Sequence, residues 1–420
     1  MDVIERVRDM AARAQRASRV LANASGGQKT AALKNLASLL LEKQSEILEA
    51  NAQDVQRAGE AGLDQARLGR LQLNKELIQD MARACEEVSG LPDPVGGIEG
   101  MQKRPNGMLV GRMRIPLGVV AMIYESRPNV TVEAGILCIL AGNGLILRGG
   151  SEAFASNQVL AGLFSQALKQ TGLPGEAVQL VPTTDRQAVQ ELLKLEEYID
   201  VVIPRGGESL IRAVVQEARM PVLKHYQGVC HIYAHADANM DQALEIIYNS
   251  KVQKPGVCNA LECLLVHQDI APRLLPEIAQ RLGAAGVEFR AEERARSYLG
   301  DKAVPAKDKD FGCEFLDLIL AVKVVNSQKQ AEEHIERYGS HHTEAILTQS
   351  YERAMRFLNN VDASLVISNA STRFNDGGQL GLGAEIGIST SKLHAYGPMG
   401  VKELTSSKFV LLGQGQVRGG

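Results

Sequence analysis

The chain has 420 residues, more than one ordinary hydrophobic core can organise, so we expect two or three domains. Its 46 basic and 49 acidic residues give a formal net charge of −3, which excludes a basic surface for nucleic acid or an anionic membrane. No apolar run approaches the roughly 20 residues that cross a bilayer, the acidic start excludes a signal or transit peptide, and six scattered cysteines indicate reduced thiols in a cytoplasmic protein.

The first ninety residues are predicted to be helical. Residues 26–58 place Leu33, Leu36 and Ile47 at helical spacing between charged residues. Residues 96–116 have a different pattern: apolar and polar residues partly alternate, with glycines between them. This pattern predicts an extended ribbon or hairpin. Such an exposed ribbon needs a partner strand, and another subunit is one source of it.

From Leu117 onward, short strands and helices alternate. We expect strands at residues 117–124, 144–148, 176–181, 199–204 and 221–225, and helices at 130–142, 151–172, 185–195 and 207–218. Ser151 is the expected N-cap of the second helix, and Gly142 and Gly172 are expected to end the first two. The alternation predicts right-handed βαβ units in a doubly wound parallel sheet, followed by a second α/β region at about residues 230–366.

Two strand-to-helix loops suit a nucleotide. Arg148-Gly149-Gly150 and Arg205-Gly206-Gly207 each lead from a predicted strand into a helix, where free N–H groups can face phosphate. The alternative is that both are ordinary turns rich in glycine. The glycine-rich stretch at residues 378–387 follows no buried strand, so we do not interpret it as a dinucleotide fingerprint.

Cys258 could be a nucleophile, half of a metal clip, or a core residue. A lone cysteine in a cytosolic protein is usually a small buried hydrophobe, and this suits Cys85, Cys138 and Cys263. Cys258 differs because it follows a Pro-Gly turn and precedes an apolar strand, which can expose the thiol and direct its N–H toward an oxyanion. Its spacing from Cys263 is unusual for a metal, and a polar loop explains the histidines at residues 341–342, so we expect no metal site.

Several stretches of the sequence resemble the aldehyde dehydrogenase superfamily in their residues and in their order. Those that carry the superfamily resemblance are PLGVVAMI, AGNGLILRGGSEA, TGLPGEAVQLV, PRGGESLI, PGVCNALE, CEFLDLILAV and SLVISNASTRFNDGG. YESRPNVT, STRFNDGGQLGLGAEIGIST and KLHAYGPMG are typical of a branch that reduces an acyl phosphate. The resemblance implies an α/β, aldehyde-dehydrogenase-like fold, with a Rossmann-type doubly wound parallel sheet, a second α/β catalytic domain and a small strand arm for oligomerisation. The expected boundaries are 1–100 and 117–229 for the cofactor domain, 230–395 for the catalytic domain, and 101–116 and 396–420 for the arm.

The resemblance also assigns roles to particular residues. Cys258 is the implied nucleophile, and Glu314 falls where the superfamily places an acidic residue near the nicotinamide ribose. The implied cofactor loops are Arg148, Gly149, Gly150 and Ser151, and Gly206, Gly207, Glu208 and Ser209. NAD-using relatives often carry a glutamate near the position of Ser151, so a serine there is compatible with NADPH, although Glu152 stands next to it.

The remaining site residues are expected from the chemistry. The Cys258 N–H and the Asn129 amide are the expected donors to an oxyanion, although a helix cap after Pro128 would also explain Asn129. A substrate with carboxylate and phosphate groups needs cations and donors. Arg373 and Asn375 are the candidates for these contacts, with Lys254 as a third. A solvated polar loop is the alternative for all three.

The implied reaction is NADPH-dependent reduction of L-glutamate 5-phosphate to L-glutamate 5-semialdehyde in proline biosynthesis, with release of phosphate, through a cysteine thioester. Oxidative members use a glutamate to activate hydrolytic water, and the corresponding residues 224–228 (KHYQG) carry no carboxylate. The alternatives are an oxidative or CoA-acylating aldehyde dehydrogenase on the same fold and a silent scaffold, and the cysteine argues against the scaffold. The expected partners are a second copy of the chain and a separate glutamate 5-kinase, with neither nucleic acid nor membrane.

Overall fold

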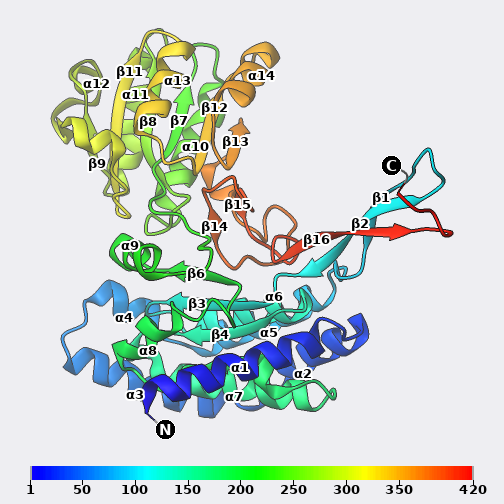
Figure 1. Cartoon of the computed structure of the whole chain (residues 1–420). Helices are drawn as coiled ribbons and strands as arrows, with labels where there is room; N and C mark the ends of the chain where they lie inside the picture. Colours follow the sequence, from blue (N-terminus) through cyan, green and yellow to red (C-terminus); the bar gives the residue numbers. More distant parts are fainter. Residues whose placement is uncertain (1, 419–420) are drawn as a thin grey trace. The chain divides into compact units, whose positions relative to one another are not determined.

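The computed structural model describes residues 2–418, which pack into two compact units (Figure 1). Unit 1 comprises the chain up to Lys224, Gly381–Gly387 and the part from Met399 onward. Unit 2 comprises His225–Leu380 and Ile388–Pro398. This division keeps the strand arm with unit 1, whereas the arm was predicted as a separate part. It also places residues 381–387 in unit 1 and residues 225–229 and 396–398 in unit 2, unlike the predicted boundaries.

Five helices form the beginning of unit 1, as the sequence predicted. They are α1 (Val3–Leu21), α2 (Gly26–Glu42), α3 (Gln44–Glu60), α4 (Gln65–Leu71) and α5 (Lys75–Ser89). Asp2 with Glu5, and Ser25 with Gln28, form capping boxes that satisfy the free N–H groups at the starts of α1 and α2. The predicted apolar stripe of α2 and α3 is buried, so these helices are stabilised mainly by tertiary packing.

Unit 1 contains a four-stranded parallel sheet with the order β5-β4-β3-β6. The strands are β3 (Val119–Tyr124), β4 (Gly144–Arg148), β5 (Val178–Leu180) and β6 (Val201–Arg205). The helices that follow them are α6 (Asn129–Leu140), α7 (Phe154–Lys169), α8 (Arg186–Leu192) and α9 (Glu208–Glu217). The chain adds β4 and β5 on one side of β3 and β6 on the other, so the predicted doubly wound sheet is confirmed.

The central strand β3 is buried along its whole length, which explains its continuous apolar sequence. Val119 and Ala121 pack against Val7 and Ala11 of α1 on one face. The α6 and α7 helices pack against each other, and a Cβ at Gly135 would lie 2.2 Å from the Phe164 ring. Glycine therefore lets these two helices approach closely.

Two local predictions in unit 1 are wrong. Residues 221–225 form no strand and touch the sheet through a single bridge between Val202 and Val222. Ser151 begins a short 3-10 helix (Ser151–Ala153) and does not cap α7 with its side chain. Instead, the buried Asp54 of α3 accepts hydrogen bonds from the N–H groups of Ala155 (3.2 Å) and Ser156 (2.7 Å). The side chain of Asp54, about a hundred residues earlier in the sequence, thus satisfies the free N–H groups at the start of α7.

The predicted ribbon becomes β1 (Ile98–Lys103) and β2 (Leu109–Pro116), and its partner strand comes from the same chain. The C-terminal strand β16 (Thr405–Leu412) pairs antiparallel with β2, giving the order β1-β2-β16. In Figure 1 this three-stranded arm extends away from the helices of unit 1. Phe409 is 70% exposed and Leu412 is 59% exposed, so the arm presents apolar surface beside an open strand edge.

Unit 2 contains a seven-stranded parallel sheet with the order β10-β9-β11-β8-β7-β12-β13, which confirms the predicted second α/β region. Its strands are β7 (Cys230–Ala234), β8 (Leu261–His267), β9 (Glu288–Ala291), β10 (Ala303–Pro305), β11 (Ile319–Val325), β12 (Thr343–Leu347) and β13 (Leu365–Ser368). The helices are α10 (Met240–Val252), α11 (Ala271–Ala284), α12 (Glu293–Leu299), α13 (Gln328–Tyr338) and α14 (Tyr351–Asn360). A short antiparallel pair, β14 (Ile388–Ser389) and β15 (Gly397–Pro398), completes the unit.

The two central strands of this sheet, β7 and β8, are fully buried. Cys258 lies in the loop between α10 and β8, so it stands at the amino end of β8, whereas His267 ends that strand. Across residues 2–418, every helix is too short or too polar to cross a bilayer.

Candidate active site

Cys258 is partly exposed, whereas Cys85, Cys138 and Cys263 are buried as predicted. Two turns after α10 carry the chain to Cys258, and β8 begins three residues later. Cys258 is thus held next to a buried strand while the residue itself stays partly exposed. Partial exposure is one of the features that reactive cysteines share.

The peptide group of Cys258 is clamped by the start of β7. A Cβ placed on Gly228 would lie 2.1 Å from the Cys258 carbonyl oxygen, so no other residue fits at Gly228 without moving the loop. The Cys230 thiol donates a hydrogen bond to the same oxygen at 3.1 Å. These contacts fix the backbone that carries the thiol.

Asn259 fixes the loop from the other side. Its Nδ2 donates to the carbonyl oxygens of Asn375 (2.9 Å) and, more weakly, Arg373 (3.4 Å). Asn259 is buried. The hydrogen bonds of its side-chain amide therefore link the cysteine loop to the polar turn that contains the predicted substrate residues Arg373 and Asn375. The stretch STRFND therefore lies beside the cysteine loop within unit 2.

Glu314 also meets Gly228, because its Oε1 accepts the Gly228 N–H at 2.9 Å. Gly228 thus contacts both the predicted nucleophile and the acidic residue predicted near the nicotinamide ribose. Farther along the Glu314 loop, the N–H of Leu316 donates to Glu262 Oε1 at 3.1 Å. Since Glu262 belongs to β8, the strand behind Cys258 also positions the Glu314 loop.

A buried ion pair between Lys251 and Glu262 also stabilises the surroundings of the cysteine loop. Lys251 Nζ of α10 lies 2.7 Å from Glu262 Oε2, and both side chains are fully buried. Burial raises the pKa of Glu262 to about 7, although the ammonium opposes the shift. Burial lowers the pKa of Lys251, and the carboxylate opposes that shift. The pair joins the end of α10 to β8 on either side of the cysteine loop.

The three predicted substrate contacts lie in different surroundings. Arg373 is partly buried, and its Nε donates to Gln253 at 2.9 Å. Burial lowers the pKa of Arg373, while Asp376 and the Cys258 thiol raise it. Asn375 is fully buried, with its Nδ2 bonded to Thr343 Oγ1 at 2.7 Å, so it shapes the turn from within. Lys254 is exposed one turn before the thiol.

In unit 1, the predicted cofactor loops follow β4 and β6 at the carboxyl edge of the sheet. Arg148 Nη2 donates to the Thr184 carbonyl at 3.2 Å, and burial lowers the pKa of Arg148. At the start of α9, the Gly207 N–H donates to Glu125 Oε2 at 2.9 Å. A carboxylate thus already occupies the kind of position that a phosphate oxygen would take at a helix N-terminus.

The other candidates in unit 1 have local partners. Glu152 Oε1 accepts the Ser126 N–H at 2.8 Å, and Glu208 pairs with Arg212 of the same helix. Asn129 begins α6, but its amide donates to Glu133 Oε1 at 2.7 Å. No side chain caps α6 within the described chain, so the alternative of an Asn129 helix cap is wrong. Its role as an oxyanion donor stays a prediction.

Sequence reasoning missed the residues that hold the cysteine loop, namely Gly228, Cys230, Lys251, Asn259 and Glu262. Asn259 and Glu262 were visible as polar residues flanking an apolar strand start. Gly228 was considered only for the carboxylate that its segment lacks. The approach of β7 to the loop before β8 depends on sheet pairing, which leaves no periodic signal.

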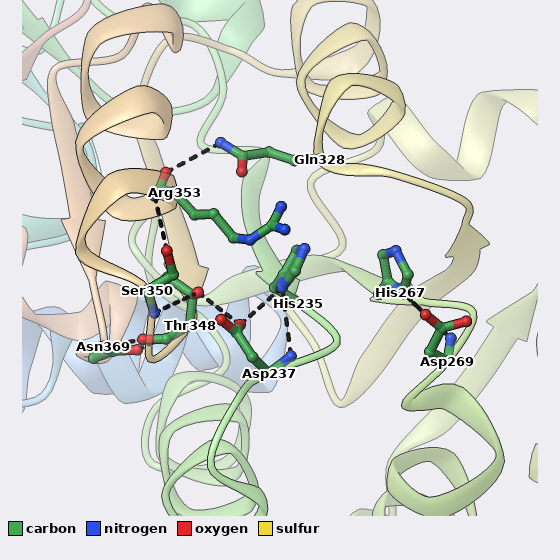
Figure 2. Close-up of polar contacts among 9 residues, drawn as sticks. All are labelled: His235, Asp237, His267, Asp269, Gln328, Thr348, Ser350, Arg353 and Asn369. Carbon is green, nitrogen blue, oxygen red and sulfur yellow. Dashed lines mark hydrogen bonds and ion pairs between the residues drawn. The ribbon is translucent and has the colours of Figure 1, made fainter.

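A second polar cluster occupies the carboxyl edge of the unit 2 sheet, after β7, β8 and β12 (Figure 2). His235 pairs with Asp237 at 2.8 Å, Asp237 accepts from Thr348 Oγ1 at 2.7 Å, and Asn369 bonds the Thr348 backbone. Ligands commonly bind at this edge of parallel sheets. Here these polar groups bond one another and tie the loops together, whereas the predicted nucleophile lies at the opposite, amino edge.

The comparisons with known proteins agree with this architecture. The aldehyde dehydrogenase family profile matches residues 4–295, and the chain belongs to that family. The relatives narrow the class: a gamma-glutamyl phosphate reductase of Oleidesulfovibrio alaskensis is 60% identical over 418 residues and the full length of both chains. These matches confirm the predicted fold, family and oxidoreductase class.

Solved structures give the same result. The crystal structure of gamma-glutamyl phosphate reductase from Thermotoga maritima has a TM-score of 0.95 and 46% identity, and the match covers 98% of this chain and 100% of that one. The glyceraldehyde-3-phosphate dehydrogenase GapN from Methanocaldococcus jannaschii, solved in complex with NADP, has a TM-score of 0.68 at 17% identity. Its match covers 98% of this chain and 95% of that one, and supports the shared fold alone.

Proposed function

We propose that this chain reduces L-glutamate 5-phosphate to L-glutamate 5-semialdehyde with NADPH and releases phosphate, as a step of proline biosynthesis. Two findings support the substrate: the full-length similarity to gamma-glutamyl phosphate reductases, and a partly exposed Cys258 thiol beside the Arg373 turn. The observation that best supports a reduction, as opposed to a hydrolytic oxidation, is the close approach of Gly228 to the Cys258 carbonyl group. The segment that ends there packs on the nucleophile loop and contains no carboxylate to activate hydrolytic water.

In the proposed mechanism, the Cys258 thiolate attacks the acyl carbon, the carbon–oxygen bond to phosphate breaks, and inorganic phosphate leaves. This covalent route divides one difficult substitution into two easier steps. NADPH, when bound, supplies the hydride that reduces the thioester. The carbon–sulfur bond then breaks, which releases the aldehyde and returns the thiolate. The clamped backbone holds the Cys258 N–H as one donor to the developing oxyanion, and Asn129 is proposed as the second.

The cofactor would be held by unit 1 through the loops after β4 and β6. The Gly207 N–H already donates to the Glu125 carboxylate, which supports a preference for negative charge at the start of α9. Arg148 offers a guanidinium at the end of β4, which is separated from β6 by β3. Glu152 is engaged by Ser126, which lessens its conflict with the 2′-phosphate of NADPH. In unit 2, Glu314 would contact the nicotinamide ribose.

The substrate would be anchored by Arg373, with Lys254 as a further cation. Arg373 Nε is bonded to Gln253, which orients the guanidinium beside the cysteine loop. Asn375 acts in this proposal through the shape of the turn, because its side chain is buried and bonded to Thr343. The acyl phosphate itself must come from a separate phosphorylating enzyme that acts on the glutamate side chain, which agrees with the expected glutamate 5-kinase.

The assay that tests this proposal runs the reaction backward, from L-glutamate 5-semialdehyde and NADP, in three arms. We expect NADPH to form with inorganic phosphate and to form very slowly without it, because phosphate must release the acyl group from Cys258. An oxidative dehydrogenase would work equally well without phosphate. A CoA-acylating enzyme would need coenzyme A in place of phosphate. Either of these results would overturn the proposed reaction.

We also propose that the arm β1-β2-β16 joins copies of the chain. Its exposed Phe409 and Leu412 and its open strand edges are features that another subunit can cover. We expect the protein to have a native mass that is a multiple of 45.4 kDa. We further expect Phe409→Asp with Leu412→Asp to reduce it toward that of one chain. A wild-type monomer in light scattering would contradict the proposal.

A further inference from the structure

Two histidines and a cysteine converge in the core of unit 2, outside the candidate active site. His231 of β7 and Cys263 of β8 are directly opposite each other in the parallel register, and α13 places His334 over the same face of the sheet. His231 and Cys263 are fully buried, and His334 is 5% exposed. One ligand atom from each side chain lies within 4.8 Å of the other two, and Cys263 Sγ lies 3.7 Å from His334 Nε2.

These separations are close to those around a tetrahedral metal ion. Bonds of about 2.3 Å to sulfur and about 2.0 Å to nitrogen place neighbouring ligand atoms about 3.3–3.6 Å apart. The triangle therefore needs only rotamer-scale movements to close around an ion. Imidazole nitrogen and thiolate sulfur are the ligand types that Zn²⁺ prefers, and three protein ligands leave a fourth position for water.

His231 provides the second observation. Both of its ring nitrogens are buried without a well-formed hydrogen bond, although Nδ1 lies 3.0 Å from Glu344 Oε2. Buried polar atoms without partners are rare and need a reason. A carboxylate behind one nitrogen of a histidine is the usual arrangement when the other nitrogen binds a metal. Glu344 is itself held by the His231 N–H at 3.0 Å.

We propose that His231, Cys263 and His334 form a zinc site, in which Glu344 orients His231 through Nδ1 and Nε2 faces the ion. Binding converts the Cys263 thiol to a thiolate and releases its proton to solvent, together with any second proton on the histidines. The ion would tie α13 to β7 and β8. The inference is independent of the proposed reaction, because none of these side chains belongs to the nucleophile loop.

The positive charge of Lys323 is expected to weaken metal binding at His334, so replacing this lysine tests the proposed site. Its Nζ lies 3.5 Å from His334 Nδ1 and 5.4 Å above the Phe311 ring. When the ammonium donates to Nδ1, the ring proton of His334 resides on Nε2, which blocks the ligand atom. Lys323 is only partly buried, so it can turn away, but zinc must displace it. Removing this charge should therefore tighten metal binding.

The experiment titrates the metal-free full chain with Co²⁺, a spectroscopic substitute for Zn²⁺, in a buffer without thiols. We expect one equivalent to give tetrahedral ligand-field bands and a sulfur-to-cobalt charge-transfer band, and Zn²⁺ to bleach both. Cys263→Ser should remove the charge-transfer band, whereas Cys313→Ser, a matched cysteine of unit 2, should keep it. Glu344→Gln should weaken binding by about 10–100-fold, and Lys323→Gln should strengthen it several-fold.

Other outcomes would contradict the proposed zinc site. Loss of the band in Cys258→Ser, with retention in Cys263→Ser, would place the ion at the nucleophile. Absence of any cobalt spectrum in the wild-type chain and in Lys323→Gln would show a buried histidine–cysteine network without metal affinity. If Cys263→Ser or Glu344→Gln fails to fold, the partly exposed Lys323→Gln decides alone, because equal or weaker affinity in that variant contradicts the proposed geometry.

Discussion

Replacing Cys258 by serine is expected to reduce turnover by about 10⁴-fold or more, because a hydroxyl without an adjacent base is a far weaker nucleophile than a thiolate. The thiol is partly exposed, and the clamp on its peptide group involves backbone atoms, so the variant should fold normally. The measurement is NADPH formation in the reverse assay with phosphate, together with NADPH binding by fluorescence, which should persist.

Cys313→Ser is the matched control, because Cys313 is also a partly exposed thiol of unit 2. We expect it to keep nearly full activity. Phosphate-dependent turnover in Cys258→Ser at a level near that of Cys313→Ser would exclude the covalent route. Loss of NADPH binding together with turnover would indicate instead that the substitution had damaged the fold.

Replacing Lys251 by methionine is expected to cost unit 2 about 3–5 kcal/mol, since it leaves the Glu262 carboxylate buried without its partner. A loss of this size should lower the melting temperature of the unit 2 transition by about 10 °C. The matched control is Lys392→Met. Lys392 lies 2.6 Å from Asp362 in the same unit, but both side chains are about half exposed or more, so the cost should stay at or below about 1 kcal/mol.

The dependence on pH separates this explanation from simple loss of packing. Burial raises the folded-state pKa of Glu262 above its unfolded value, so the folded state binds the extra proton and the cost of the bare carboxylate grows as pH rises above about 4.5. Lys251→Met should therefore be less destabilised at pH 5 than at pH 8. In Glu262→Gln the buried ammonium is the bare charge, and its cost should shrink as pH rises, because the folded-state pKa of Lys251 is lowered.

The double variant Lys251→Met with Glu262→Gln should be more stable than the sum of the two single changes implies, because it leaves no bare charge. The glutamine can still accept the Leu316 N–H that Glu262 binds. Additive losses, or equal losses at both pH values, would show that the ion pair does not govern the stability of this region.

The elements of the fold were predictable where the signal was local. The stripe of α2 and α3, the strand β4 and the turns at Gly142 and Gly172 follow from spacing, and both glycines adopt the positive φ angles expected after a helix. The wrong predictions concern places where the local structure depends on a segment that is distant in the sequence. Asp54 replaces Ser151 at the start of α7, and the segment near Val222 lacks the strand pairing that its apolar residues suggested.

The candidate site shows the same division. The Pro-Gly turn before Cys258 indicated an accessible thiol, and the resemblance to aldehyde dehydrogenases pointed to Glu314 and to the loops at Arg148 and Gly206. Neither indicated that Gly228 would contact both Cys258 and Glu314, because that contact depends on the close approach of β7 to the loop before β8. The buried Asn375 shows the reverse case, since its polar sequence context suggested solvent and substrate.

By itself, the sequence determined the class of fold, the alternation of strands and helices and the family, and it singled out Cys258 as the predicted nucleophile, because each depends on residue type at short spacing. Only the tertiary structure decided which side chains hold that thiol, where the arm finds its partner strand, and that His231, Cys263 and His334 meet. These arrangements depend on strand order and register, which bring together residues separated by tens to hundreds of positions. Short-range periodicity carries no information about such pairs.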